Sequence, residues 1–346
     1  MVDFHGWELP VQYSGILAEH RGCRQAAALF DTSHMGQLRI RAPGAALGRV
    51  TTQDAAALGV GRGRYGFLLD ECGGILDDTV LMRLAEEDFL LVVNAATAEA
   101  DAAWVRRHLA EGEVVVQSAE GWGKLDVQGP LSAQVLAPHS DADLRALRYF
   151  SNAPASVCGH GCIVSRTGYT GELGYEIFAP AEAIVAVFRE LLADGRAVPA
   201  GLGARDSLRL EMGYPLFGED MDAATTPFEA NAAGFVALDR EFIGAEALRR
   251  LASEAPERLL VAFASESRQR PRARGELRSE GRAVGVVTSA GFSPSLEVSI
   301  GMGYVPPELA AAGTRLAAET RRGELAVTVT DTPLYTHGTC RTRTPR

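Results

Sequence analysis

Hydrophobic and polar positions change period several times along the chain, and each period predicts a different element. Apolar residues recur at three- and four-residue steps over residues 16–30, which predicts an amphipathic helix ending near Asp31. Residues 37–41 alternate as a strand does, and residues 65–69 and 79–83 are typical of a β-hairpin. The continuously apolar run 89–93 predicts a strand buried on both faces. Thr97 is placed to cap the helix that we expect over residues 98–111.

The second half of the chain begins with a similar mixture of strand and helical patterns, and its last part shows almost no helical pattern. Strand patterns lie at residues 124–127, 163–166 and 173–178, and helical patterns lie at residues 131–136, 181–194 and 205–212. After an arginine-rich stretch at 265–274, short strands and turns predict a small β-domain. We therefore predict an α+β fold of mixed antiparallel sheets with helices, followed by a C-terminal β-barrel.

Composition narrows the class of protein. The 346 residues are 47% hydrophobic and 23% charged, which is typical of a soluble globular protein with two or three domains. A net charge of -10 gives no general attraction for nucleic acid or an anionic membrane. No run approaches the roughly 18 to 20 apolar residues of a membrane helix, and the first ten residues do not resemble a signal peptide. Five cysteines without a secretory signal predict a reducing, cytoplasmic location.

One cysteine and histidine cluster could suggest a metal. Cys158, His160 and Cys162 are closely spaced, but a closed zinc site needs about four ligands and no second pair accompanies them. We predict no bound metal. The sequence also shows no serine, histidine or cysteine arrangement with nucleophile spacing, so nothing in it requires covalent catalysis.

Asp101 is a candidate for chemistry because of its position. It lies near the start of the helix expected after the buried strand that ends before Asn94. A carboxylate there is stabilised by the helix dipole and lies where ligands often bind. A simple helix N-terminal acid explains the same observation, and the residue pattern alone favours that explanation.

Glu176 is a second candidate because it interrupts an apolar strand face between Gly174 and Phe178. A buried carboxylate is costly unless it is paired. Its partner is either a ligand with two parallel N–H groups or an arginine, for which Arg205 and Arg209 are both available. Arg205 can in turn bind a carboxylate of the protein or of a ligand. Tyr169, in a turn-rich loop, either covers a flat ring or packs on its own domain.

Taken together, these segments resemble the glycine cleavage T-protein family along nearly the whole chain. The matching stretches include Leu-Phe-Asp-Thr-Ser-His-Met-Gly at 29–36, Gly-Gly-Ile-Leu-Asp-Asp at 73–78 and Val-Val-Asn-Ala at 92–95. Further matches lie at 4–13, 128–130, 166–177, 201–211, 226–227, 242–244, 287–289 and 293–296. Their order and spacing carry the resemblance, since any one of them alone is weak.

The resemblance implies an architecture and a reaction. It implies three domains around a central hole: residues 1–48 with 125–225, residues 49–124 with 226–264, and a C-terminal barrel over 265–346. The hole would hold tetrahydrofolate. A lipoylated H-protein would deliver an aminomethyl group, ammonia would leave, and the carbon would pass to N5 of the folate before ring closure onto N10. The activity implied is that of an aminomethyltransferase of the glycine cleavage system.

The resemblance also assigns site residues. Asp101 would accept a proton or stabilise the cation that forms beside the reacting nitrogens. Glu176 would pair with the pterin ring, and Arg205 would hold the folate and orient Glu176. Asn94 and Tyr169 match neighbouring pocket positions. A further match, Arg272, would lie where the lipoyl arm enters, although a generic exposed arginine explains it nearly as well. The interpretation requires Asp101, Glu176 and Arg205 to converge in one cavity.

Two rival functions share this fold. One is a folate-dependent demethylase of a methylated amine or sulfonium compound; the fused flavin oxidase domain of some such relatives has no room in this chain, and Asp101 is retained. The other is a non-catalytic folate-binding maintenance protein. That group carries a Lys-Gly-Cys-Tyr-x-Gly-Gln motif, whereas this chain has Arg-Glu-Phe-Ile-Gly at 240–244, without a cysteine.

Overall fold

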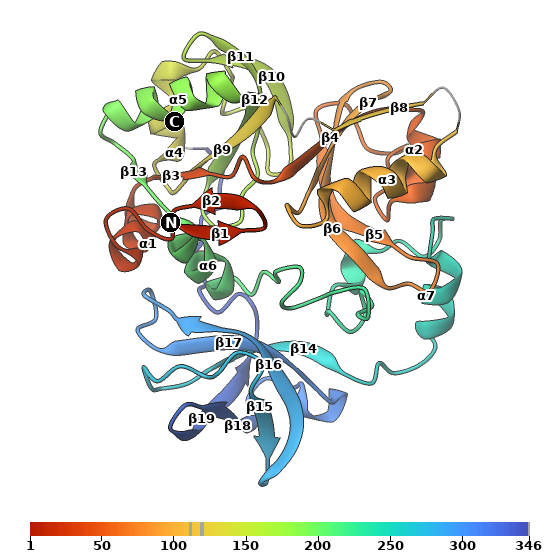
Figure 1. Ribbon diagram of the computed structural model, residues 1–346, viewed down its shortest axis with the longest axis vertical. Helices are drawn as coiled ribbons and strands as arrows, with labels where there is room; N and C mark the ends of the chain where they lie inside the picture. The colour runs from red at the N-terminus through yellow and green to blue at the C-terminus, as the bar shows by residue number, and fades with distance from the viewer. Residues whose placement is uncertain (111–112, 118–120, 345–346) are drawn as a thin grey trace. The chain divides into compact units, whose positions relative to one another are not determined.

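The computed structural model describes residues 1–110, 113–117 and 121–344, and the chain divides into two compact units (Figure 1). The first unit comprises Met1–Leu68, Asp77–Arg205 and Gly338–Arg346. The second comprises Leu69–Leu76 and Asp206–His337.

A six-stranded sheet forms one half of the first unit. Its order is β10-β11-β12-β9-β3-β13, and all neighbours are antiparallel except the pair of β13 with β3. The strands are β3 (Ala28–Asp31), β9 (Trp122–Gln128), β10 (Asn152–Val157), β11 (His160–Ser165), β12 (Gly174–Pro180) and β13 (Val198–Pro199). Helices α1 (Ile16–Gln25), α4 (Ser132–Leu136) and α5 (Ala181–Ala193) pack against it, α5 on β9 and β12. Leu125, Val127, Tyr175 and Ile177 are fully buried in its core.

The helix predicted to continue to Asp31 ends earlier, so that prediction was wrong at its C-terminal end. Helix α1 stops at Gln25, and Ala28–Asp31 is strand β3. Leu29 pairs with Val127 of β9, and Phe30 pairs with Asp126. Leu29 and Phe30 are both buried. Apolar spacing alone does not distinguish a helix end from a short buried strand, and here pairing with a distant strand decides the conformation.

A five-stranded sheet of order β5-β6-β7-β4-β8 forms the other half of the first unit. Its strands are β4 (Gly36–Arg41), β5 (Gly63–Leu69), β6 (Ile75–Ala85), β7 (Asp88–Val93) and β8 (Val114–Gln117), with helices α2 (Gly44–Val50) and α3 (Ala98–His108) beside them. Strand β7 is buried on both faces, as its continuous apolar run predicted. Thr97 precedes α3, but its hydroxyl donates to the carbonyl oxygen of Asn94 rather than capping the helix. Residue 111 of the predicted helix lies outside the described residues. A two-stranded sheet of β1 (Val2–Phe4) and β2 (Trp7–Leu9) lies near the N-terminus.

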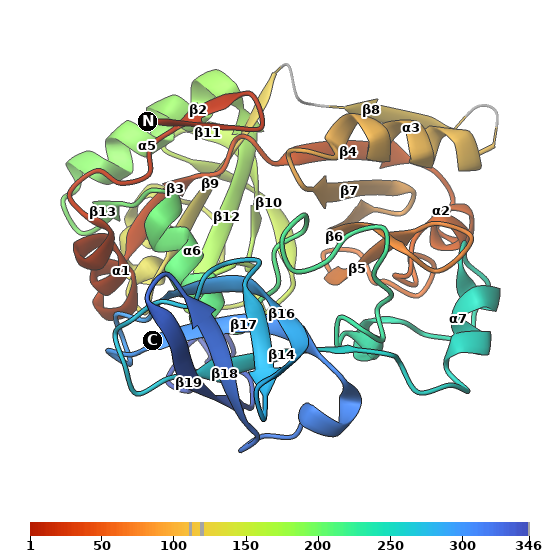
Figure 2. The ribbon, with the colours of Figure 1, turned by 60° about the horizontal axis from the view of Figure 1, so that its bottom comes forward.

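A closed antiparallel barrel forms most of the second unit (Figure 2). Its strand order is β14-β17-β16-β15-β18-β19. The strands are β14 (Leu259–Ala264), β15 (Glu276–Ser279), β16 (Arg282–Phe292), β17 (Ser299–Val305), β18 (Arg315–Thr320) and β19 (Gly323–Thr330). Phe263, Leu277 and Val287 are fully buried in its core. A Cβ atom at Gly301 would lie 2.5 Å from the ring of Phe263, so the strand approaches that ring closely only because glycine lacks a side chain. Helix α7 (Ala245–Leu251) precedes the barrel.

The predicted fold class is confirmed: an α+β chain of several sheets with a C-terminal β-barrel. Helix α6 (Leu202–Glu211) joins the two units. The division into three domains with the boundaries given above stays a prediction. Among the described residues, no helix has both the length and the apolar character that crossing a membrane would take.

Candidate active site

A cluster of polar side chains occupies the end of β7, where α3 follows. The Asn94 side chain donates one hydrogen bond to Asp77 Oδ1 and one to Asp78 Oδ1, each at 2.8 Å. The Asn94 backbone N–H donates to Asp77 Oδ2 at 2.9 Å, and the Tyr65 hydroxyl donates to Asp78 Oδ2 at 3.1 Å. The register that pairs Val80 with Val92 explains this arrangement, because continuing it two residues brings Asp78 opposite Asn94.

Asp101 belongs to the same cluster and lies at the start of α3, as predicted. It is 2% exposed, and its Oδ2 has no hydrogen-bond partner among the described residues. Burial raises the pKa of Asp101 to about 6, against the opposing effect of hydrogen bonds from Asp77 and Thr97. Burial, and then the charge and hydrogen bond of Asp101, raise the pKa of Asp77 well above its ordinary value. Two adjacent buried carboxylates do not readily ionise together, so Asp77 and Asp101 bind a proton more tightly than isolated carboxyl groups do.

Asp78, in this cluster, is expected to make the stability of the fold depend on pH. Burial, followed by the charge of Asp77, raises the pKa of Asp78 from 3.8 to about 7. A raised folded-state pKa means that the native protein binds this proton more tightly than the unfolded chain does, so the contribution is stabilising at low pH and is lost as pH rises toward 7. We expect the melting temperature of the parent, relative to that of Asp78→Asn, to fall as pH rises from about 4 to about 7. A constant difference over that range in thermal denaturation would contradict the assignment.

A second cluster surrounds a buried lysine on the six-stranded sheet. Lys124 is 2% exposed, and its ammonium group donates to Asp126 Oδ1 at 2.5 Å and to Glu176 Oε1 at 2.8 Å. Glu176 faces Asp126 directly across the β12–β9 pair. The other oxygen of Glu176 accepts a hydrogen bond from Thr167 Oγ1 at 2.6 Å. Glu176 is therefore a buried acid that has protein partners for both of its oxygens.

The protein partner of Glu176 is one that the sequence reasoning missed. Arg205 and Arg209 were the expected alternatives, whereas the structure places Lys124 there. A signal for Lys124 exists, because Lys124, Asp126 and Gln128 alternate with apolar residues along β9 and so share one face of the sheet. Asp77 and Asp78 were also given no role, although two adjacent acids inside an otherwise apolar strand are unusual.

Arg205 lies in the same cluster as Glu176. Its guanidinium donates to Asp126 Oδ2 at 3.2 Å and stacks over the ring of Tyr169 at 4.8 Å. Asp126 thus connects Arg205 to the Lys124 ammonium that Glu176 also binds. Arg209, by contrast, belongs to the second unit, where it pairs with Asp220 at 2.7 Å and donates to Ser289 at 2.8 Å.

Each of the two clusters in the first unit contains a tyrosine, Tyr65 in one and Tyr169 in the other. Burial raises the pKa of Tyr65 well above its ordinary value, the charge of Asp78 adds to this, and Tyr169 is close enough to contribute. Tyr65 bonds to Asp78 on one side, and Tyr169 lies under Arg205 on the other. The predicted residues therefore lie in two polar clusters of the first unit, Asn94 and Asp101 in one and Tyr169, Glu176 and Arg205 in the other. That they face a single cavity stays a prediction.

Arg272 lies in the second unit, on the segment before β15. Its side chain is 63% exposed and donates to Glu319 Oε1 at 3.0 Å. An exposed ion pair of this kind fits a generic surface arginine as well as a binding role. Its predicted place beside the lipoyl arm stays a prediction.

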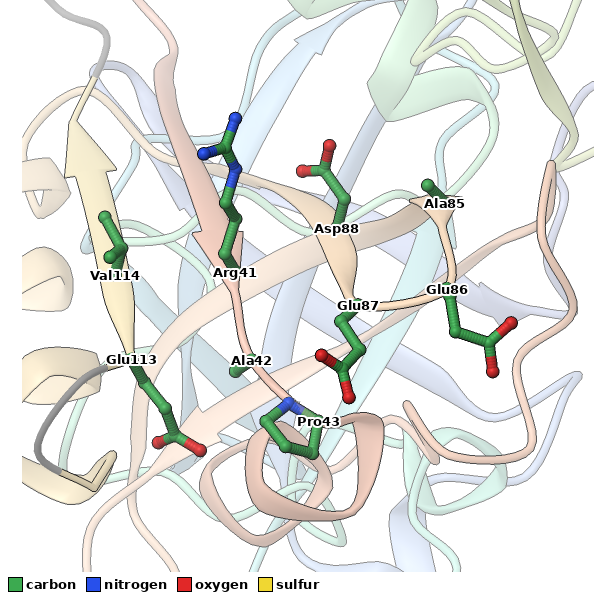
Figure 3. Close-up of a pocket in the computed structure, with 9 residues that line it drawn as sticks. All are labelled: Arg41, Ala42, Pro43, Ala85, Glu86, Glu87, Asp88, Glu113 and Val114. Carbon is green, nitrogen blue, oxygen red and sulfur yellow. The ribbon is translucent and has the colours of Figure 1, made fainter.

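One surface cavity lies away from these residues. It measures about 480 Å³ and is lined by Arg41, Pro43, Glu86, Glu87 and Asp88, among others (Figure 3). Arg41 ends β4 and Asp88 begins β7, so the cavity is at the opposite end of the sheet from Asn94. None of the predicted site residues lines it.

The predicted cysteine and histidine cluster divides in the structure. Among the described residues, Cys158 groups with His139 and Glu190, whose ligand atoms all lie within 4.8 Å of one another. Both ring nitrogens of His139 already contact carboxylates, Glu190 at 3.2 Å and Asp194 at 2.8 Å. His139 is therefore already in contact with two carboxylates of the protein. The prediction that the protein binds no metal stays a prediction.

Comparisons with known proteins identify the family of the chain. The family model described as "GCVT N-terminal domain" matches residues 1–240, and that of the "Glycine cleavage T-protein C-terminal barrel domain" matches residues 258–336. Proteins named "Aminomethyltransferase" from Rubrobacter xylanophilus and Halothermothrix orenii are 46% and 38% identical, over 89% and 96% of this chain and 84% and 95% of their own lengths.

A solved structure adds a match of the whole fold. The glycine cleavage system aminomethyltransferase T from Bartonella henselae is 37% identical, with a TM-score of 0.91 over 100% of this chain and 95% of its own. The identities and coverage are far above what a shared fold alone requires. The chain belongs to the glycine cleavage T-protein family.

Proposed function

We propose that this protein is the aminomethyltransferase of a glycine cleavage system. It transfers the methylene carbon of an aminomethyl group, carried on the dihydrolipoyl arm of H-protein, to tetrahydrofolate, and ammonia is released. The observation that carries the proposal is the buried Asp101, whose Oδ2 has no hydrogen-bond partner among the described residues of the first unit. The relatives named aminomethyltransferase support the reaction class.

A negative charge beside the transferred carbon would favour this reaction, because that carbon becomes electron-poor as it is transferred. The carbon passes between sulfur and nitrogen, so positive charge develops on it and on the nitrogens that it joins. Asp101 is mostly ionised at neutral pH with its pKa of about 6, and its fixed carboxylate stabilises that charge. The same carboxylate accepts a proton from the folate as the new bonds to nitrogen form. Asn94 and Asp77 fix the surroundings of Asp101, since Asn94 ties Asp77 in place.

The second cluster supplies the features that a reduced pterin needs. Glu176 accepts one hydrogen bond on each oxygen from the protein, and a carboxylate has roughly four lone-pair sites, so it can still accept from two parallel N–H groups of a ligand. The ammonium group of Lys124 holds one oxygen of Glu176 in place. Arg205 holds Tyr169 by stacking, and Tyr169 covers the flat ring. Arg272 contacts the lipoyl arm in this proposal.

A turnover assay tests the proposal against the demethylase alternative. The protein is supplied with tetrahydrofolate and either aminomethyl-loaded H-protein or small methylated amines and sulfonium compounds. We expect 5,10-methylenetetrahydrofolate and ammonia from loaded H-protein only. H-protein that lacks its lipoyl group is the matched control and should give no product. Turnover with a small methyl donor alone would overturn the proposal.

The role of Glu176 makes a separate prediction for binding. We expect Glu176→Gln to weaken tetrahydrofolate binding by about tenfold to a hundredfold, since hydrogen bonds to a charged group contribute about 1.5 to 3 kcal/mol. Isothermal calorimetry measures the affinity. Glu182→Gln, an exposed acid on α5, serves as the control and should bind like the parent. Equal affinities for both variants would mean that Glu176 is only half of a structural ion pair.

A further inference from the structure

His34 lies in the short loop that joins β3 to β4, against the Lys124 cluster. The loop is held firmly: the Thr32 backbone N–H donates to the carbonyl oxygen of Lys124 at 3.0 Å, and the Thr32 hydroxyl donates to Asp126 Oδ1 at 2.9 Å. The Phe4 ring meets the imidazole edge-on, with centroids 5.4 Å apart. The loop that carries the imidazole is therefore fixed to β9, the strand of Lys124 and Asp126, to which the proposed function links Glu176 and Arg205.

The histidine is buried and has an unused nitrogen. It is 5% exposed, and its Nδ1 has no hydrogen-bond partner among the described residues. Buried polar atoms in native proteins are nearly always paired, and an unpaired one destabilises the fold. An unpaired buried nitrogen, in a loop that is bonded to Asp126, therefore calls for a partner that the described residues do not provide. Asp101 Oδ2, in the other cluster, has the same property.

The charge state of His34 limits what that partner is. Burial lowers the pKa of His34 to about 3, with further lowering by the positive charges of Arg205 and Lys124 and by His5, while Asp126 opposes the shift. The imidazole is neutral at any pH at which the protein works, so it neither attracts an anion nor exchanges protons in turnover. A neutral ring nitrogen recognises the polar edge of an uncharged heterocycle through a directed hydrogen bond.

We infer that His34 Nδ1 forms a hydrogen bond with the polar edge of the tetrahydrofolate pterin ring, beside Glu176 and Arg205, and so is a ligand-binding residue. The inference rests on the proposed function, because it names the same ligand. A hydrogen bond with the neutral imidazole, next to the carboxylate of Glu176, helps to orient the pterin ring and adds no charge to the site. His34 thus helps to fix which edge of the ring meets Glu176.

Two near-isosteric substitutions separate the two ring nitrogens. The amide of asparagine reaches the position of Nδ1, whereas the amide of glutamine reaches the position of Nε2. We expect His34→Asn to bind tetrahydrofolate within about threefold of the parent by calorimetry, and His34→Gln and His34→Phe to bind about tenfold more weakly. In turnover, His34→Gln should raise the KM for tetrahydrofolate and leave kcat near the parent value. The exposed His5→Gln is the matched control and should change neither quantity.

A stability measurement distinguishes ligand binding from a structural role. His34→Phe removes an unpaired buried nitrogen, so without folate its melting temperature should equal or exceed that of the parent, even though it binds folate more weakly. Parent-like affinity in His34→Gln, with His34→Asn no better, would overturn the inference and leave the proposed function intact. A parent protein that binds no tetrahydrofolate would overturn both. If His34→Phe does not fold, the comparison of His34→Asn with His34→Gln still decides.

Discussion

Replacing Asp101 with asparagine is expected to lower turnover about 10²- to 10⁴-fold, the usual range for a positioned acid or base. The substitution keeps the size of the side chain and removes its negative charge. Asp101 is 2% exposed, so no solvent charge or water replaces the lost carboxylate beside the electron-poor carbon. Folate binding should change much less, because the pterin contacts assigned to Glu176 and Arg205 lie in the other cluster.

Single-turnover formation of 5,10-methylenetetrahydrofolate from loaded H-protein measures the effect on the chemical step. Glu99→Gln is a suitable control, because Glu99 is an exposed acid in the first turn of the same helix. It should react like the parent. Near-normal methylene transfer by Asp101→Asn, with folate bound, would remove Asp101 from the mechanism. The melting temperature of Asp101→Asn should not fall, since the change relieves crowding of acids with Asp77 and Asp78.

The position of Asp101 could be predicted from the sequence, whereas its surroundings could not. A continuous apolar run followed by a helical period locates the end of β7 and the start of α3, and Asp101 follows from these two local signals. Asp77 and Asp78 come from β6, and their approach depends on the β6–β7 register. Register is decided by pairing between strands, which a single strand's pattern does not report. The raised pKa of Asp101 therefore could not be predicted from the sequence.

For Glu176, the need for a partner could be predicted from the sequence, but the identity of that partner could not. Period-two alternation correctly marked it as a buried acid in need of a partner. The expected partner was either a ligand with two parallel N–H groups or an arginine of a later helix, Arg205 or Arg209, and no lysine was considered. The partner is Lys124, two residues from Asp126 on a strand adjacent to β12. Sheet order brings β9 beside β12 from about 50 residues away in sequence, a distance at which local patterns carry no information about pairing.

Lys124→Met is expected to give the largest loss of stability, about 3 to 5 kcal/mol in the free energy of unfolding. Methionine fills a similar volume but leaves the carboxylates of Asp126 and Glu176 facing each other without the ammonium between them. Asp126 is fully buried, and Arg205 reaches only its other oxygen. Breaking a buried ion pair by removing one partner costs far more than the intact pair contributes, because the remaining charge stays buried.

Urea unfolding of the parent and of Lys124→Met at one pH measures the difference. Arg272→Met is the matched control, since it removes one cation from the exposed pair with Glu319 and should leave stability almost unchanged. Adding Glu176→Gln to Lys124→Met should recover part of the loss, because it removes one of the two stranded charges. A double variant as unstable as the sum of the two single variants would show that the three groups do not act as a unit. In that case the buried lysine would stabilise the sheet by packing alone, and Glu176 would not depend on it for its charge.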